Sequence, residues 1–344
     1  MSPMFTILLV PFLAAMFLAI NMGGSGTAPS FAAAYGAGII RKDIIPGLFG
    51  LFVFFGALLA GKEVALTISR GILPNEYITL TLTTIILVSV GLALLLANLL
   101  GVPQSTTQAT VFALAGPAAY LKVLKAKYLL LNIVPAWFLL PLIAFVLAFL
   151  VGRFFYHPVR RKWPTLDQAG GHLPMVDWLV IAASCFVAFS IGSNNVANAA
   201  GPIAAMVVNE LNLDGSGSSF MLIMTLSVLL VAPCFGIGSS LFGAKVIRTT
   251  GKELLEFGPL GATIISMITA TLLLTVSVTR GIPSSLVQMN TFAIIGLGIS
   301  EHGWREMLKD TPVLKIVSVW FAAPLIAMIL SVVMTMLAER LGML

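Results

Sequence analysis

Long apolar stretches with almost no charge constrain the fold of this chain more than any other feature of its sequence. Residues 78–100, 128–151, 258–279 and 312–337 each carry at most one charged side chain. Each stretch exceeds the ~20 residues that a helix needs to cross a hydrocarbon core. Over all 344 residues, 59% are hydrophobic and 9% are charged, against roughly 25% charged in soluble domains. The sequence therefore predicts an all-α polytopic membrane protein.

The charges that are present indicate a topology and not a nucleic-acid partner. The formal net charge is +6, but the basic residues lie in short loops, with the densest cluster at Arg153, Arg160, Arg161 and Lys162. Short basic loops of membrane proteins face the cytoplasm. The first apolar run, Met4–Ile20, has no Lys or Arg before it, so we expect a retained helix and not a cleaved signal. We expect a multi-pass protein of the inner (plasma) membrane.

The sequence contains an internal duplication. Residues 101–116 match residues 281–296 at seven of sixteen positions, and residues 133–144 match residues 316–327 at eight of twelve. The division predicts a first transmembrane repeat at 1–155, a central cytoplasmic linker at 156–173 and a second repeat at 174–344. We expect about five to six helices in each repeat. An odd number of crossings would invert the second repeat, an arrangement that places a substrate site at the repeat interface; parallel repeats are the alternative.

A polar motif at residues 192–202, Gly-Ser-Asn-Asn-Val-Ala-Asn-Ala-Ala-Gly-Pro, interrupts the apolar run 175–208. A buried amide without hydrogen-bond partners costs roughly 2–7 kcal/mol, so three asparagines at membrane depth indicate a function. Asn194 and Asn198 are four apart and share one face of a helix. Gly192 lies where a helix could begin with free N–H groups. We interpret the motif as a helix break that binds a ligand.

Three further segments carry similar polar residues. Pro103–Tyr120 and Pro283–Ser300 each follow a long span after a Gly-x-Pro turn, and we expect them to form two re-entrant hairpins whose helix N-termini face each other. Residues 21–30, the first-repeat counterpart of the asparagine motif, hold three glycines in four positions. We expect a second helix break there, with close approach of the backbone to a ligand; a glycine-rich packing face is the alternative.

These four segments contain Ser, Thr, Asn, Gln and Gly but no acidic residue. Neutral donors together with helix N-termini predict a site for a small oxyanion. We expect no catalytic residue and no metal ligand. The candidate substrate-binding residues are Gly24, Ser25, Gly26, Thr27, Ser105, Thr106, Thr107, Asn194, Asn195, Asn198, Ser284 and Ser285, with Asn21, Gln108 and Gln288 as candidates for support or coupling.

Residues 192–199 and 103–108 resemble the two signature elements of the inorganic phosphate transporter (PiT) family. The resemblance covers both halves and implies an inverted-repeat fold with discontinuous helices, facing hairpins, an oxyanion held at helix N-termini and a homodimer. Where the family has aspartates, this chain has Asn195 and Gly24; where the family has histidines, it has Gln108 and Gln288. With its Gly-Gly-Ser-Gly-Thr first motif, the chain is most similar to the bacterial sulfate permease branch.

The sequence thus predicts a secondary transporter that imports a tetrahedral oxyanion, with sulfate first and a phosphate symporter as the alternative. Sulfate is a bare dianion that a nearby carboxylate would repel, whereas phosphate keeps a proton near neutral pH. The coupling ion, H⁺ or Na⁺, stays open, as does a passive channel. An enzyme is disfavoured because Ser25 has no base nearby and the three histidines fall in loops.

Overall fold

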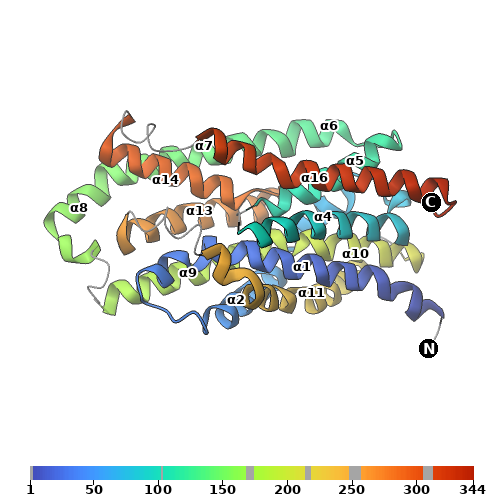
Figure 1. Ribbon diagram of the computed structural model, residues 1–344, viewed down its shortest axis with the longest axis horizontal. Helices are drawn as coiled ribbons and strands as arrows, with labels where there is room; N and C mark the ends of the chain where they lie inside the picture. The colour runs from blue at the N-terminus through green and yellow to red at the C-terminus, as the bar shows by residue number, and fades with distance from the viewer. Residues whose placement is uncertain (1–2, 102–103, 168–173, 214–217, 248–256, 305–312) are drawn as a thin grey trace.

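The computed structural model describes residues 3–101, 104–167, 174–213, 218–247, 257–304 and 313–344. All regular elements in these ranges are helical, and the long helices lie roughly along one axis of an elongated bundle (Figure 1). Seven of the described helical segments are long and apolar enough to cross a membrane. An eighth span is added if α2 and α3, which are bent by 74° at Gly61, form one broken segment. The predicted all-α polytopic membrane fold is confirmed.

In its described residues, the first half of the chain contains seven α-helices, one short 3₁₀ helix and two short π-helices. They are α1 (Pro3–Gly36), α2 (Ile45–Ala60), α3 (Lys62–Arg70), η1 (Asn75–Tyr77), α4 (Leu80–Leu100), α5 (Thr106–Tyr120), α6 (Ala126–Tyr128), η2 (Leu129–Ile133), α7 (Val134–Val151) and η3 (Gly152–Tyr156).

The connection and the second half are likewise helical in their described residues. They comprise α8 (His157–Lys162), η4 (Pro164–Asp167), α9 (Pro174–Asn195), α10 (Ala197–Glu210), α11 (Ser218–Gly238), η5 (Ser239–Gly243), α13 (Gly258–Arg280), α14 (Leu286–His302) and α16 (Val313–Arg340). The four predicted long spans correspond to α4, α7, α13 and α16.

Repeat-equivalent glycines end two of the long helices. Gly101 after α4 has φ 71°, and Gly281 after α13 has φ 58°. This left-handed conformation favours glycine and lets the chain leave the helix abruptly. The short helices α5 and α14 then begin at Thr106 and Leu286, three residues after the predicted starts at Pro103 and Pro283, because Ser105 and Ser285 are their N-caps.

Helices of each half pack against helices of the other half in corresponding pairs. Helix α5 packs on α16 while its equivalent α14 packs on α7, and α1 packs on α11 while α2 packs on α9. In Figure 1, α1 runs from the right end toward the left, whereas α9 starts at the left. Each half is therefore completed by helices of the other half.

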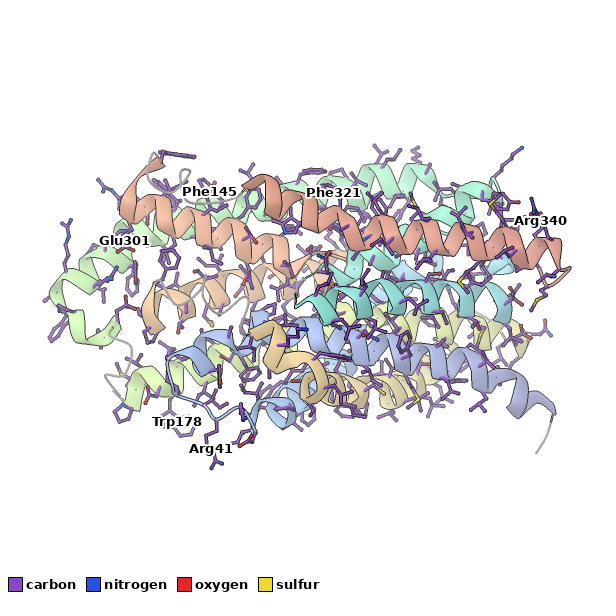
Figure 2. The ribbon with its side chains drawn as sticks, viewed as in Figure 1. Arg41, Phe145, Trp178, Glu301, Phe321 and Arg340 are labelled. Carbon is purple, nitrogen blue, oxygen red and sulfur yellow. The ribbon has the colours of Figure 1, made fainter. Side chains whose placement is uncertain are left out.

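The outer surface suits contact with lipid. Leu59, Phe138 and Leu241 are 73%, 68% and 64% exposed, which is unfavourable in water but not in hydrocarbon. Figure 2 shows Glu301 beside α8 at the left end of the bundle and Arg340 at the right end, with Phe321 on α16 between them. Charged groups at the ends and apolar groups along the length fit a membrane normal near the long axis.

The predicted helix break at residues 21–30 is wrong, because α1 continues through them to Gly36. The glycines serve close packing: a Cβ on Gly23 would lie 2.2 Å from the Phe235 carbonyl oxygen, and one on Gly24 would lie 2.7 Å from Phe242 Cβ. Thr27 and Ser30 donate their hydroxyl hydrogens to the carbonyls four residues earlier, at 2.7 and 3.1 Å. Such bonds are satisfied inside an intact helix.

The predicted helix break at Gly192 is also wrong, and the second motif holds only a one-residue interruption of the helix. Gly192 lies within α9 and is fully packed, since a Cβ there would lie 2.1 Å from the Val53 carbonyl oxygen. α9 and α10 are separated by one residue, Val196, whose backbone is itself helical (φ −60°, ψ −32°), and together they form one apolar span, Pro174–Glu210. The second helix begins at Ala197, five residues after Gly192.

The segment between the halves is anchored to the second half. The Tyr156 hydroxyl donates to Asp167 Oδ2 at 2.6 Å, and Asp167 Oδ1 accepts from the Leu260 backbone N–H at 3.0 Å near the start of α13. Arg160 forms ion pairs with Asp167 and Glu301. Burial raises the pKa of the Asp167 carboxyl above its ordinary value. Residues 168–173 of the predicted linker, and Pro103 of the first hairpin, lie outside the described residues.

Candidate oxyanion-binding site

The polar segments converge on one small cavity inside the bundle. Its volume is about 20 Å³, so a ligand there would touch all of its walls. Eight of the twelve predicted substrate-binding residues line it: Ser25, Gly26, Ser105, Thr106, Thr107, Asn195, Ser284 and Ser285. The remaining four do not line it: Asn194 and Asn198 contact Thr107 from behind the wall, Gly24 packs against Phe242, and Thr27 lines a different cavity.

Two helix N-termini point into this cavity. Ser105 caps α5 by accepting the Gln108 N–H at 3.2 Å, and Ser285 caps α14 by accepting the Gln288 N–H at 3.4 Å. The first N–H groups of an α-helix have no partner within the helix. In α5 these belong to Thr106 and Thr107, and in α14 to Leu286 and Val287, all of which line the cavity. A set of N–H groups at two helix N-termini around one cavity is an anion site.

The two N-termini are joined by a reciprocal pair of amides. Gln108 Nε2 donates to Gln288 Oε1 at 3.1 Å, and Gln288 Nε2 donates to Gln108 Oε1 at 3.2 Å. The two residues are 180 positions apart and occupy the same place in each repeat. Both are buried and lie outside the cavity lining, so they hold α5 and α14 together across the interface of the two halves. The expectation that the N-termini face each other is confirmed by this contact.

Asn194 and Asn198 position the wall of the cavity and do not form it. Asn194 Oδ1 accepts from the Thr107 hydroxyl at 3.1 Å, and Asn194 Nδ2 donates to Ser277 Oγ of α13 at 2.9 Å. Asn198 Nδ2 donates to Thr107 Oγ1 at 3.2 Å. Both asparagines are fully buried. Because they bond Thr107 from two sides, they fix the first turn of α5.

Asn195 is the member of the motif that reaches the cavity. It lines the wall beside Thr107, whose hydroxyl lies 3.4 Å from Asn195 Oδ1. Among the residues that the structure describes, none that lines the cavity is ionisable. The site therefore offers neutral polar groups and the partial positive charge of two helix N-termini.

The α1 side of the cavity depends on a residue that the sequence analysis missed, Asn98 of α4. The Ser25 hydroxyl donates to Asn98 Oδ1 at 2.9 Å, while Asn98 Nδ2 donates to the Asn21 carbonyl at 2.8 Å and to Asn21 Oδ1 at 3.3 Å. Asn98 is fully buried, and it is the one amide side chain in residues 78–100. A lone amide in a long apolar run was the signal that could have found it.

Five further lining residues were not predicted. Pro29, Ile191, Leu286 and Val287 add apolar surface, and no sequence feature distinguishes them from ordinary core residues. The fifth, Gln104, precedes the Ser105 cap and could have been found from its place in the Pro-x-Ser element. The loop before α14 is held from outside by Trp137, whose indole Nε1 donates to the Pro283 carbonyl at 3.0 Å.

Comparison with known proteins identifies the family. The model of the phosphate transporter family matches residues 22–331, which is most of the chain. The chain belongs to the phosphate transporter family. Sulfate permease CysP of Bacillus subtilis (strain 168) is 34% identical over 324 residues, covering 94% of this chain and 86% of that protein. "Putative phosphate permease TK2061" of Thermococcus kodakarensis is 25% identical over 399 residues, covering 94% and 96% of the two chains.

A solved structure confirms the fold. The structure titled "The sodium-dependent phosphate transporter" superposes with a TM-score of 0.78, covering 97% of this chain and 99% of that one at 22% identity. Family and fold together make this protein a multi-pass membrane permease of a family that carries anions.

Proposed function

We propose that this chain is a secondary transporter that imports sulfate, bound between the N-termini of α5 and α14. The observation that carries the proposal is the neutral, donor-rich cavity with Asn195 in its wall. Sulfate near neutral pH carries two negative charges and no proton, so each of its oxygens accepts hydrogen bonds and is repelled by carboxylates.

The donors of the cavity support this choice. Four N–H groups at the helix starts have no intrahelical partner. The caps Ser105 and Ser285 accept through their oxygens, so their hydroxyl hydrogens remain available to a ligand. The strong similarity to a sulfate permease, at 34% identity over 94% of the chain, favours the same substrate.

Phosphate is the second candidate because of Ser25. Its hydrogen is donated to Asn98, whose orientation is set by the two bonds from Nδ2 to Asn21. Ser25 therefore presents lone pairs to the cavity, and a lone pair suits the remaining proton of phosphate better than a bare sulfate oxygen. A phosphate symporter is the alternative function.

The remaining features of the proposal concern the assembly. We propose inverted repeats at 1–155 and 174–344, joined by the cytoplasmic linker 156–173, in a homodimer in the plasma membrane. The opposite course of α1 and α9 and the exchanged packing of the halves support the inversion. H⁺ or Na⁺ is the proposed coupling ion; the likeness to a sodium-dependent transporter supports the second.

Uptake by purified protein in proteoliposomes tests this function. Labelled sulfate should accumulate against its gradient when an inward H⁺ or Na⁺ gradient is imposed, and excess unlabelled sulfate should compete better than phosphate. Uptake that follows phosphate and ignores sulfate would establish the alternative. Equilibration without accumulation under both ion gradients would indicate a passive channel.

A further inference from the structure

Gln104 is the lining residue whose hydrogen bonding is incomplete. Its side chain is 4% exposed and forms part of the cavity wall, and its Oε1 is buried without a hydrogen-bond partner. Buried polar atoms are almost always paired, so an unpaired one beside a cavity indicates a missing ligand. Gln104 lies in the loop between α4 and α5, next to the Ser105 cap.

The other amide in the wall has a polar neighbour for its oxygen, and Gln104 has none. Asn195 Oδ1 lies 3.4 Å from Thr107 Oγ1, whose hydrogen is donated to Asn194 Oδ1 at 3.1 Å, whereas Gln104 Oε1 is buried without a hydrogen-bond partner. A glutamine amide can turn to present either two N–H donors or a carbonyl acceptor. Gln104 can therefore match a bare oxygen or a protonated oxygen without any charge of its own.

The equivalent position in the second repeat does not offer this group. Gln104 corresponds to Ser284, whose hydroxyl donates to the Ile282 carbonyl at 3.1 Å and whose backbone N–H donates to Asn194 Oδ1 at 3.4 Å. The second loop is thus satisfied by its own surroundings, and the first loop brings an unpaired amide to the cavity. The asymmetry places Gln104 on the ligand side of an otherwise duplicated structure.

We propose that the Gln104 side-chain amide is a direct ligand of the bound oxyanion and turns to match its protonation state. It donates through Nε2 to sulfate and accepts through Oε1 from a protonated phosphate oxygen. This assignment rests on the proposed function, because it concerns the ligand of the same cavity. It adds a specificity-determining residue from the first loop, within the 103–108 element but not among the residues first predicted to bind substrate.

The test compares Gln104→Met, which keeps the length of the side chain but removes its hydrogen bonds, with Gln104→Glu, which fixes it as an acceptor. The matched control is Asn290→Leu on α14, because Asn290 Oδ1 is also buried without a partner but lies outside the cavity lining. Dissociation constants for sulfate and phosphate are measured by titration calorimetry on detergent-purified protein, after the fold is checked by size-exclusion chromatography.

Loss of a hydrogen bond to a charged ligand should weaken binding of sulfate by about 10- to 100-fold in Gln104→Met. Gln104→Glu should weaken the binding of sulfate at least as much, with a smaller loss of phosphate affinity at pH 6. The dissociation constants of Asn290→Leu should stay within about twofold of those of the wild type. If Gln104→Met does not fold, Gln104→Asn, which withdraws the amide by one methylene, replaces it with the same expected direction.

Two outcomes would overturn the proposal in distinguishable ways. Wild-type affinity for sulfate in a folded Gln104 variant would overturn the role of Gln104 while leaving the proposed function intact. A wild type that binds neither anion would overturn the proposed function, and this assignment with it.

Discussion

The two copies of the duplicated motif, residues 21–30 and 192–202, have become different structures. In the first copy α1 is continuous, its glycines admit other helices, and two of its hydroxyls bond to carbonyls within the helix. In the second copy the helix is interrupted by a single residue, Val196, whose backbone stays helical, and the amides of the motif bond across to α5 and α13. One copy is therefore a packing surface and the other a set of cross-links.

Despite this difference, each copy is tied by one buried amide to the long span that precedes the short capped helix of its own half, α4 before α5 and α13 before α14. In the second half the amide belongs to the motif, because Asn194 donates to Ser277 of α13. In the first half it belongs to the span, because Asn98 of α4 bonds to Ser25 and Asn21 of α1. The duplicated fold keeps the connection but has moved the group that makes it from one helix to the other.

The largest expected effect is that of Asn194→Ala. The substitution leaves the Thr107 and Ser277 hydroxyls and the Ser284 N–H without their amide partner. Unpaired buried groups should lower the free energy of unfolding by about 2–4 kcal/mol. Chemical denaturation in detergent measures it; a variant as stable as the wild type would mean that the second copy is not a set of cross-links.

Asn98→Ala should have a similar but smaller effect in the first half. It removes the acceptor of Ser25 and the donor to the Asn21 carbonyl, which predicts a loss of about 1–3 kcal/mol in the free energy of unfolding. Ser25→Ala serves as a control, because it removes one of these bonds and should cost less. A larger loss in Ser25→Ala than in Asn98→Ala would show that Asn98 is not the hub of the first half.

Asn195→Asp should change the affinity for the substrate more than the stability of the protein. A carboxylate in the cavity wall repels a dianion, so sulfate affinity should fall by about 10- to 30-fold, with a smaller loss for protonated phosphate. Calorimetric titration with both anions measures the change. An unaltered ratio of the two affinities would contradict the role of neutrality at this position.

The smallest expected effect is that of pH on sulfate binding by the wild type. Since no ionisable residue is described in the cavity lining and sulfate does not titrate near neutrality, the dissociation constant should change less than about twofold from pH 6 to pH 8. Titrations in detergent, where no ion gradient exists, separate the pH dependence of binding from any effect of ion coupling. A steep dependence would indicate an ionisable group that senses the ligand.

The sequence predicted the parts of the molecule that depend on local rules. The four long spans follow from apolar length, and the ends of α4 and α13 follow from Gly101 and Gly281. The two short segments were predicted to start at Pro103 and Pro283, but α5 and α14 start at Thr106 and Leu286, after serine caps that the prediction did not include. Eight of the twelve predicted substrate-binding residues line the cavity for the same reason, because most of them belong to or adjoin helix starts.

The parts that could not be predicted depend on which helices meet. From the sequence alone, Gly23, Gly24 and Gly192 could each have marked either a helix break or a close contact between helices. The structure shows close contacts, with the backbones of α11 and α2 and with side chains of η5 and α4. These neighbours are distant in the sequence, so no local pattern contains them. In a bilayer the backbone keeps its helical hydrogen bonds unless another group satisfies them, so glycine alone does not unwind α1. The position of the unpaired Gln104 amide likewise follows from the convergence of distant segments.

The most direct test of the central claim is competition for the wild-type site. Purified protein is equilibrated with labelled sulfate at pH 7.5 and titrated with unlabelled sulfate, phosphate and chloride. A site of neutral donors at two helix N-termini predicts saturable sulfate binding that sulfate displaces at lower concentration than phosphate and that chloride displaces poorly. Displacement by phosphate at lower concentration than by sulfate would contradict it.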